Sequence, residues 1–168
     1  MNTSASTAFA PLARLHSARL LFAASILCLS TSAVAALPGH LTATAKTSPA
    51  VVKIGGKGVL VVRLTVASGF HVNSIKPLDA YLIPTTVTVA GVTGVAFGTP
   101  VYPAAVSITE GSGKVLAYTN TVVVKIPFSV KFGARSGSVS GAVHYQACTS
   151  ESCFPPTTAA FSAPITIK

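Results

Sequence analysis

Two cysteines near the C-terminal end of the chain are the residues whose types and spacing most directly suggest chemistry. Four small or polar residues separate Cys148 from Cys153, and Pro155 and Pro156 close the segment. A hairpin loop of about four residues brings its flanking positions opposite each other. Opposed residues of an antiparallel pair have Cα atoms about 4.5–5.5 Å apart, within reach of a disulfide bond. The spacing therefore predicts a Cys148–Cys153 cystine.

The direction in which this cystine faces decides whether it is structural or redox-active. In the preceding strand Val143 and Tyr145 alternate with His144 and Gln146, and the same alternation puts Cys148 on the polar face. A solvent-facing cystine is open to attack by another protein's thiolate, whereas a cystine that links two sheets points inward. The alternation favours a redox-active cystine, provided that no bulge changes the register before Cys148.

The first 35 residues have the pattern of a secretory signal peptide. Arg14 and Arg19 make its start basic, residues 20–29 are apolar, and residues 33–35 (Ala-Val-Ala) form a small-x-small cleavage motif. The apolar run is too short for the roughly 20 residues that cross a bilayer. We therefore expect cleavage after residue 35, a periplasmic location and a single domain over residues 36–168, with no membrane-spanning segment in the mature chain.

Signal cleavage also changes the cysteine count. Cys28 lies inside the apolar run, so its removal leaves Cys148 and Cys153 as one pair, in a compartment where disulfides persist. A lipoprotein signal with Cys28 as the lipidated residue is an alternative, although Leu27 precedes it where a small residue is usual.

Basic residues outnumber acidic residues, but they are scattered. Twelve Lys and Arg stand against three Asp and Glu, for a formal net charge of +9. Nucleic-acid binding usually needs a basic cluster or a known motif, and the sequence has neither, so we expect no nucleic-acid partner. The charge indicates solubility and a mild attraction to anionic partners.

Short strands separated by turns account for most of the mature chain. Segments rich in β-branched or alternating residues, bounded by Gly, Pro, Ser or Asn, predict strands at 51–54, 59–66, 85–89, 115–118, 121–130, 139–147 and 159–167. Residues 77–81 allow one helical turn within a loop. A chain of about seven to nine such strands predicts an all-β fold, an immunoglobulin-like antiparallel β-sandwich rather than a barrel.

The cysteine segment resembles a known family. Residues 145–156 (YQAC…CFPP) are similar to the active-site segment of a domain family. This family is the N-terminal periplasmic domain of the thiol:disulfide interchange protein DsbD, also described as disulfide bond corrector-like. Two further blocks, residues 69–85 and the segment Val101-Tyr102-Pro103, resemble parts of the same family. The resemblance covers most of residues 45–167.

This resemblance implies an immunoglobulin-like domain whose redox pair, Cys148 and Cys153, relays electrons between thioredoxin-like proteins and clients. One thiolate attacks a disulfide, and the other sulfur resolves the mixed disulfide. The direction of electron flow decides which cysteine attacks and which is attacked. Cys153 is preferred as the cysteine that bonds to the partner. The membrane-embedded and thioredoxin-like domains of full-length members are missing, so a thioredoxin-like protein or a membrane electron donor on a separate chain is expected. The domain itself is expected to be a monomer.

An aromatic cap shields the redox pair in this family. The corresponding segment offers Val101 and Tyr102, and Phe154 flanks the second cysteine. His71 and Asn73 stand where the family often has tyrosines. A strand-borne pair lacks the helix N-terminus that activates the thiol of thioredoxin, so slow exchange with small thiols is expected.

No cofactor and no metal ion are expected. A metal site formed by the two cysteines with His71 and His144 is conceivable, but an oxidising compartment favours the cystine. His144 is expected at the surface, about 13 Å along the strand from Cys148. Two alternatives to interchange remain: a non-enzymatic immunoglobulin-like binding domain with a structural disulfide, and an exported metal-binding chaperone.

Overall fold

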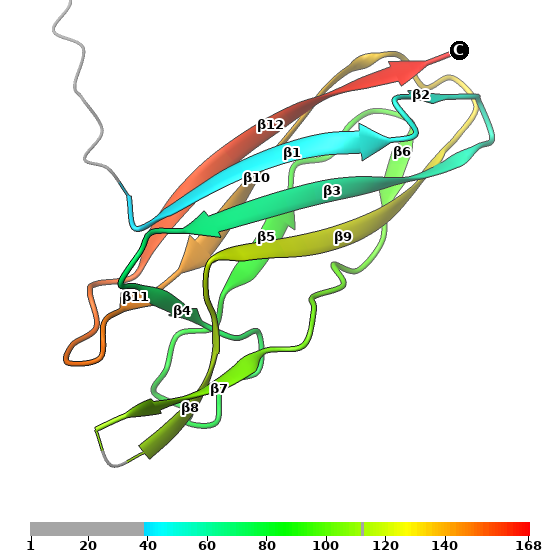
Figure 1. The fold of residues 1–168 in the computed structure, drawn as a ribbon. Coiled ribbons are helices and arrows are strands. Elements are labelled where there is room, and N and C mark those ends of the chain that lie inside the picture. The colour runs from blue at the N-terminus through cyan, green and yellow to red at the C-terminus, as the bar shows by residue number, and fades with distance from the viewer. Residues whose placement is uncertain (1–38, 112) are drawn as a thin grey trace, which may run out of the picture. The chain divides into compact units, whose positions relative to one another are not determined.

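The computed structural model describes residues 39–111 and 113–168, and this part of the chain consists of strands, turns and loops (Figure 1). Within it, no helix is long and apolar enough to cross a membrane. The expected signal peptide lies outside the described residues. The strands are β1 (Leu41–Ser48), β2 (Val51–Val52), β3 (Lys57–Val66), β4 (His71–Asn73), β5 (Thr86–Val89), β6 (Val95–Phe97), β7 (Val106–Glu110), β8 (Gly113–Tyr118), β9 (Thr121–Val130), β10 (Gly137–Tyr145), β11 (Ala147–Cys148) and β12 (Thr157–Ile167).

Two four-stranded sheets pack face to face as a sandwich (Figure 1). The strand order is β1-β3-β9-β6 in one sheet and β2-β12-β10-β5 in the other. All pairs are antiparallel except β2 with β12. The predicted all-β, immunoglobulin-like sandwich is therefore confirmed.

Strand β9 illustrates how the sequence builds this core. Val122, Val124, Ile126 and Phe128 are all buried, while Lys125 between them is exposed. Because successive side chains of a strand point to opposite faces, this alternation directs one face of β9 into the sandwich. Burying each such aliphatic side chain stabilises the fold by about 1.5–3 kcal/mol.

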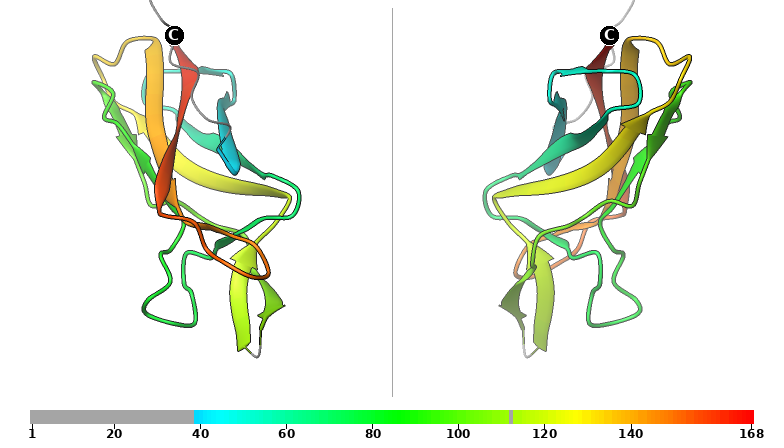
Figure 2. Two further views of the ribbon diagram at one scale, coloured as in Figure 1. Left: turned by 90° about the vertical axis from the view of Figure 1, so that its left-hand side faces the viewer. Right: turned by 90° about the vertical axis from the view of Figure 1, so that its right-hand side faces the viewer.

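A third, smaller sheet extends from the end of the sandwich opposite the C-terminus. Its strand order is β11-β4-β8-β7, and we call it the end sheet. The views of Figure 2 place its β7–β8 hairpin and the loop between β11 and β12 at this same end. The end sheet is the element that positions the cysteines, because Cys148 is the last residue of β11.

The predicted strands are all present, but β1, β4, β6 and β7 were missed, and β11 was not predicted as a strand separate from β10. Each predicted segment overlaps a strand of the structure, and β9 matches residues 121–130 in full. Strands β4 and β6 have three residues each, too few to show a period of two, and β1 alternates threonine with small alanine. Residues 77–81 form bends and a turn in place of a helical turn.

The predicted orientation of Cys148 is wrong. Tyr145 is buried and His144 exposed, as the alternation requires, but β10 ends at Tyr145 and Gln146 belongs to no strand. This interruption transfers the chain from β10 to the end sheet, where Ala147 pairs with Val72 of β4. The new strand lies between the sandwich and the β7–β8 hairpin, and both Ala147 and Cys148 are buried.

Candidate functional site

Cys148 and Cys153 form a disulfide, as their spacing predicts. Their Cα atoms lie 4.0 Å apart. Backbone hydrogen bonds flank the pair on both sides: Phe154 N–H donates to Ala147 O at 2.8 Å, and Thr149 N–H donates to Ser152 O at 2.8 Å. The cysteines thus occupy a non-hydrogen-bonded position of an antiparallel pair, where opposed side chains approach most closely.

The loop between the cysteines is ordered by the first residue after Cys148. The Thr149 hydroxyl oxygen accepts hydrogen bonds from the backbone N–H groups of Glu151 and Ser152, both at 3.2 Å. A threonine hydroxyl that bonds to nearby backbone is a common way to close a tight turn. These hydrogen bonds order the four-residue loop and so keep the two cysteines opposite each other.

The two sulfur-bearing residues have different environments. Cys148 is 0% exposed, whereas Cys153 is exposed. Cys153 lines a cleft of about 310 Å³ together with Glu110 and the loop residues 150–152. A larger cleft, of about 760 Å³, lies on the sandwich between β3, β6 and β9 and contains neither cysteine. Another protein can therefore reach the cystine from the side of Cys153.

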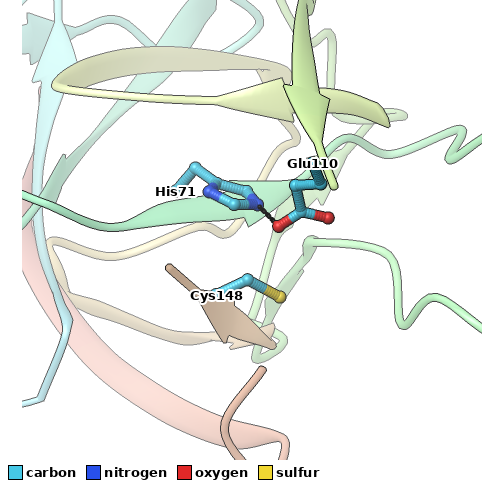
Figure 3. Close-up of side chains that lie close together, drawn as sticks. All are labelled: His71, Glu110 and Cys148. Carbon is cyan, nitrogen blue, oxygen red and sulfur yellow. Dashed lines mark ion pairs between the residues drawn. The ribbon is translucent and has the colours of Figure 1, made fainter. Parts of the chain in front are cut away.

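His71 and Glu110 lie beside the buried cysteine. His71 pairs directly with Cys148 across β4 and β11, and its side chain is only 7% exposed. Its Nε2 atom lies 2.9 Å from Oε1 of Glu110, the last residue of β7. One donor atom from each of His71, Glu110 and Cys148 lies within 4.8 Å of the other two (Figure 3). With Cys148 reduced to a thiol, these three residues have the chemistry to hold a metal ion or to move a proton.

Asn73 connects the end sheet to the interruption in the chain. Its Nδ2 atom donates to Ile83 O at 3.1 Å and to Gln146 Oε1 at 3.4 Å. Gln146 Nε2 in turn donates to Phe154 O at 3.2 Å. Gln146 therefore replaces strand pairing with side-chain hydrogen bonds, which fix the chain on both sides of the cysteine hairpin.

Three aromatic rings form a cluster that includes the residue directly after Cys153. The ring of His40 stacks on Phe70 at a centroid distance of 4.2 Å and lies 4.4 Å from the ring of Phe154. Phe70 and Phe154 are 5.7 Å apart. Phe154, a predicted flanking residue, follows Cys153 directly in the chain. It packs against two rings, one just before β1 and one just before β4.

The other predicted cap residues have contacts of their own. Val101 is 58% exposed and forms a bridge with Lys125 of β9. The Tyr102 hydroxyl accepts a hydrogen bond from Val87 N–H at 2.7 Å, and its ring stacks on Tyr118. Burial raises the pKa of Tyr102 above its ordinary value, and the Val87 hydrogen bond offsets part of that rise. A capping role for Val101 and Tyr102 stays a prediction.

Four residues around the cystine were not singled out as site residues from the sequence. Glu110 is one of only three acidic residues in the chain, and that scarcity was an available signal. Gln146 and Phe70 lie within the segments that resemble the family, next to residues that were singled out. His40 carried no signal, because its contact with Phe154 joins positions more than a hundred residues apart.

One solved structure has a similar arrangement of strands, and a second aligns less closely. The N-terminal periplasmic domain of ScsB from Proteus mirabilis aligns with a TM-score of 0.51 and 16% identity, over 76% of this chain and 48% of that chain. The fold is similar to that of the ScsB domain. The reduced N-terminal domain of DsbD from Neisseria meningitidis aligns with a TM-score of 0.42 and 19% identity, over 61% of this chain and 74% of that chain.

The likeness to the ScsB domain concerns the fold, because the sequence identity is low. The resemblance predicted from residues 69–85 and 145–156 is confirmed at that level. This chain spans about half the length of the ScsB chain that it matches. No protein-family model and no curated protein sequence matches the chain.

Proposed function

We propose that this protein is an exported thiol:disulfide interchange module that relays two electrons through the Cys148–Cys153 pair. Its partners are thioredoxin-like proteins, or a membrane electron donor on a separate chain, on one side and client proteins on the other. One observation carries the proposal: a single cystine joins an exposed cysteine to a fully buried one at the end of a hairpin. Exchange requires a sulfur that another protein's thiolate can reach, and Cys153 offers one.

The exchange proceeds in two displacements. A partner thiolate attacks Sγ of Cys153 and breaks the Cys148–Cys153 bond, whose electron pair leaves with Cys148 Sγ as a thiolate that takes up a proton. The partner's second thiolate then attacks the partner's own sulfur in the mixed disulfide, and Cys153 leaves as a thiolate and is protonated. The domain now holds two thiols and the partner a disulfide. The reverse sequence passes the two electrons to a client disulfide.

The surroundings of the cystine support this assignment of roles. A ring nitrogen of His71 lies within 4.8 Å of the Cys148 sulfur and is positioned to exchange a proton with it. The cleft beside Cys153 gives a partner access to the sulfur that is attacked. Phe154, which follows Cys153 directly, packs against the rings of His40 and Phe70. Export is supported by the signal pattern of residues 1–35.

Single-cysteine variants test the proposal. Cys148→Ser keeps the exposed cysteine and lacks the resolving sulfur, so in the native cell envelope it should accumulate mixed disulfides with thioredoxin-like partners. Cys153→Ser keeps only the buried thiol and should capture far less. The double variant is the control and should capture none. Equal capture by both single variants, or by neither, would contradict the proposal.

The reduction potential of the pair gives a second readout. Equilibration with thiol buffers should place it in the range of thioredoxin-like proteins, about −180 to −270 mV, whereas structural disulfides usually lie below about −300 mV. A value in the lower range would favour the alternative of an immunoglobulin-like binding domain with a structural disulfide.

A further inference from the structure

Three strands bring metal-binding side chains to one point beside the cystine. His71 comes from β4, Glu110 from the end of β7 and Cys148 from β11, and Figure 3 shows their polar atoms directed toward a common space. The imidazole, carboxylate and sulfur atoms all lie within 4.8 Å of one another. Nitrogen, oxygen and sulfur donors at such distances are the types that zinc binds in proteins.

A second observation concerns the histidine alone. The His71 side chain is more than nine-tenths buried, yet its Nε2 atom has no hydrogen-bond partner. The Glu110 carboxylate lies 2.9 Å away but outside the alignment that a hydrogen bond requires. Buried polar atoms are nearly always satisfied, and an unsatisfied one costs about 1–3 kcal/mol. The two atoms are close enough to contact each other as an ion pair or to contact one shared cation.

Cys153 completes the set of ligands when the disulfide opens. Its Cα atom lies 4.0 Å from that of Cys148, and it lines the same cleft as Glu110. A dithiol reductant that supplies two electrons converts the cystine into two thiols. A divalent ion can then replace both thiol protons, which are released to solvent. Two thiolates, one imidazole and one carboxylate make a four-ligand site.

We infer that reduction of the Cys148–Cys153 disulfide creates a zinc site formed by both cysteines, His71 and Glu110. Thiolates favour zinc over magnesium or calcium, and four protein ligands match its tetrahedral preference. In the oxidised protein only His71 and Glu110 remain as ligands, so zinc binding depends on the redox state. This site goes beyond the proposed interchange, because it needs a reducible disulfide and no partner protein.

Metal titration of the purified protein in both redox states tests this inference. Protein reduced with tris(2-carboxyethyl)phosphine should retain about one Zn²⁺ per chain after removal of free metal, and oxidised protein should retain close to none. His71→Ala should weaken binding by more than about tenfold, since even residues that only orient ligands contribute tenfold or more. His144→Ala is the matched control, because that histidine is exposed, and its affinity should equal that of the wild type.

Cobalt binding gives a readout that needs no variant. Reduced wild-type protein loaded with Co²⁺ should show thiolate-to-metal charge-transfer bands and the visible bands of a tetrahedral site. Equal zinc retention in both redox states would overturn the inference, and so would a His71→Ala affinity equal to that of the wild type. Partner capture by Cys148→Ser does not involve metal, so the interchange function and the zinc site can fail separately.

Discussion

The sandwich and the end sheet are built on different principles. Within the described residues, the sandwich core is apolar, and all four buried polar residues lie in β4 or in the loop from β4 to β5: His71, Asn73, Ser74 and Thr85. Three of these carry a buried atom without a hydrogen-bond partner. A separate cluster, which we call the outer cluster of the end sheet, contains three buried hydrophobic residues, far fewer than the main core: Leu82 from the loop between β4 and β5, and Val115 and Ala117 of β8.

This contrast separates stability from reactivity. Apolar burial is the main stabilising term in folding, and the sandwich contains most of it. Unsatisfied buried polar groups destabilise, and they persist where function requires them. The cystine lies in the region with fewer apolar contacts, where opening one bond need not unfold the domain. The sandwich thus supports the small region in which we propose that the cystine exchanges electrons.

The largest expected effect comes from the sandwich core. Leu60 of β3 is fully buried, so Leu60→Ala should lower the free energy of unfolding by about 2–5 kcal/mol, through lost apolar burial and the cavity left behind. Urea denaturation measures this. Leu82→Ala in the outer cluster of the end sheet is the matched variant and should lie near the lower end of that range. An equal or larger loss for Leu82→Ala would remove the contrast between the two regions.

Opening the disulfide should have a smaller effect. A disulfide that closes a 15-residue loop contributes about 3 kcal/mol in the chain-entropy account, and with a separation of five residues this one should contribute about 2 kcal/mol. The domain should therefore stay folded when reduced. Hydrogen exchange should speed up in β4 and β11 and remain slow in β3 and β9. Unfolding of the whole domain on reduction would contradict the separation of the two regions.

The sandwich could be predicted from sequence because its evidence is local. Alternation in β9 and the valine-rich segments of β3 report which face is buried, and long strands show that period clearly. The hairpin around the cysteines could also be predicted, since the number of residues between them limits the loop. Both predictions depend on neighbours in the chain.

The surroundings of the cystine could not be predicted in the same way. The interruption at Gln146 reverses the orientation of Cys148, and it depends on hydrogen bonds to Asn73 and Phe154 that no local pattern reveals. The contact between His71 and Glu110 joins two strands that are not neighbours in the end sheet. Such contacts arise only when distant segments pack, so sequence indicated His71 as a candidate without its partner.

A smaller effect is expected at the aromatic edge of the site. Phe154→Ala removes ring contacts with His40 and Phe70, worth about 0.5–1.5 kcal/mol, at the position directly after Cys153. We expect this truncation to make the cystine more accessible. The rate at which dithiothreitol reduces the cystine should rise severalfold. Labelling of the free thiols over time measures this rate. Phe132→Ala is the control, because that ring is 94% exposed, and it should change neither stability nor rate. An unchanged rate in Phe154→Ala would show that the rings do not protect the cystine.

The last prediction concerns Tyr145 of the sandwich and the stability of the fold at alkaline pH. Burial raises the pKa of Tyr145 above its ordinary value of 10.0, and a hydrogen bond from the Leu41 backbone offsets part of the rise. A raised pKa means that the fold favours the neutral phenol. Its contribution is complete below pH 10 and is lost as the pH rises through the folded-state pKa.

Tyr145→Phe should therefore reduce the loss of stability above pH 10, by at most about 1.4 kcal/mol per pH unit, while costing about 0.5–1.5 kcal/mol at neutral pH through the lost hydrogen bond. Urea denaturation between pH 8 and pH 11 measures both effects. Tyr81→Phe is the control, since Tyr81 is 77% exposed. Tyr145 is the last residue of β10, directly before Gln146, so the same variant tests where the sandwich ends and the end sheet begins. An unchanged reduction potential of the Cys148–Cys153 pair in Tyr145→Phe would place this boundary at Gln146. A shifted potential would move that boundary into the sandwich.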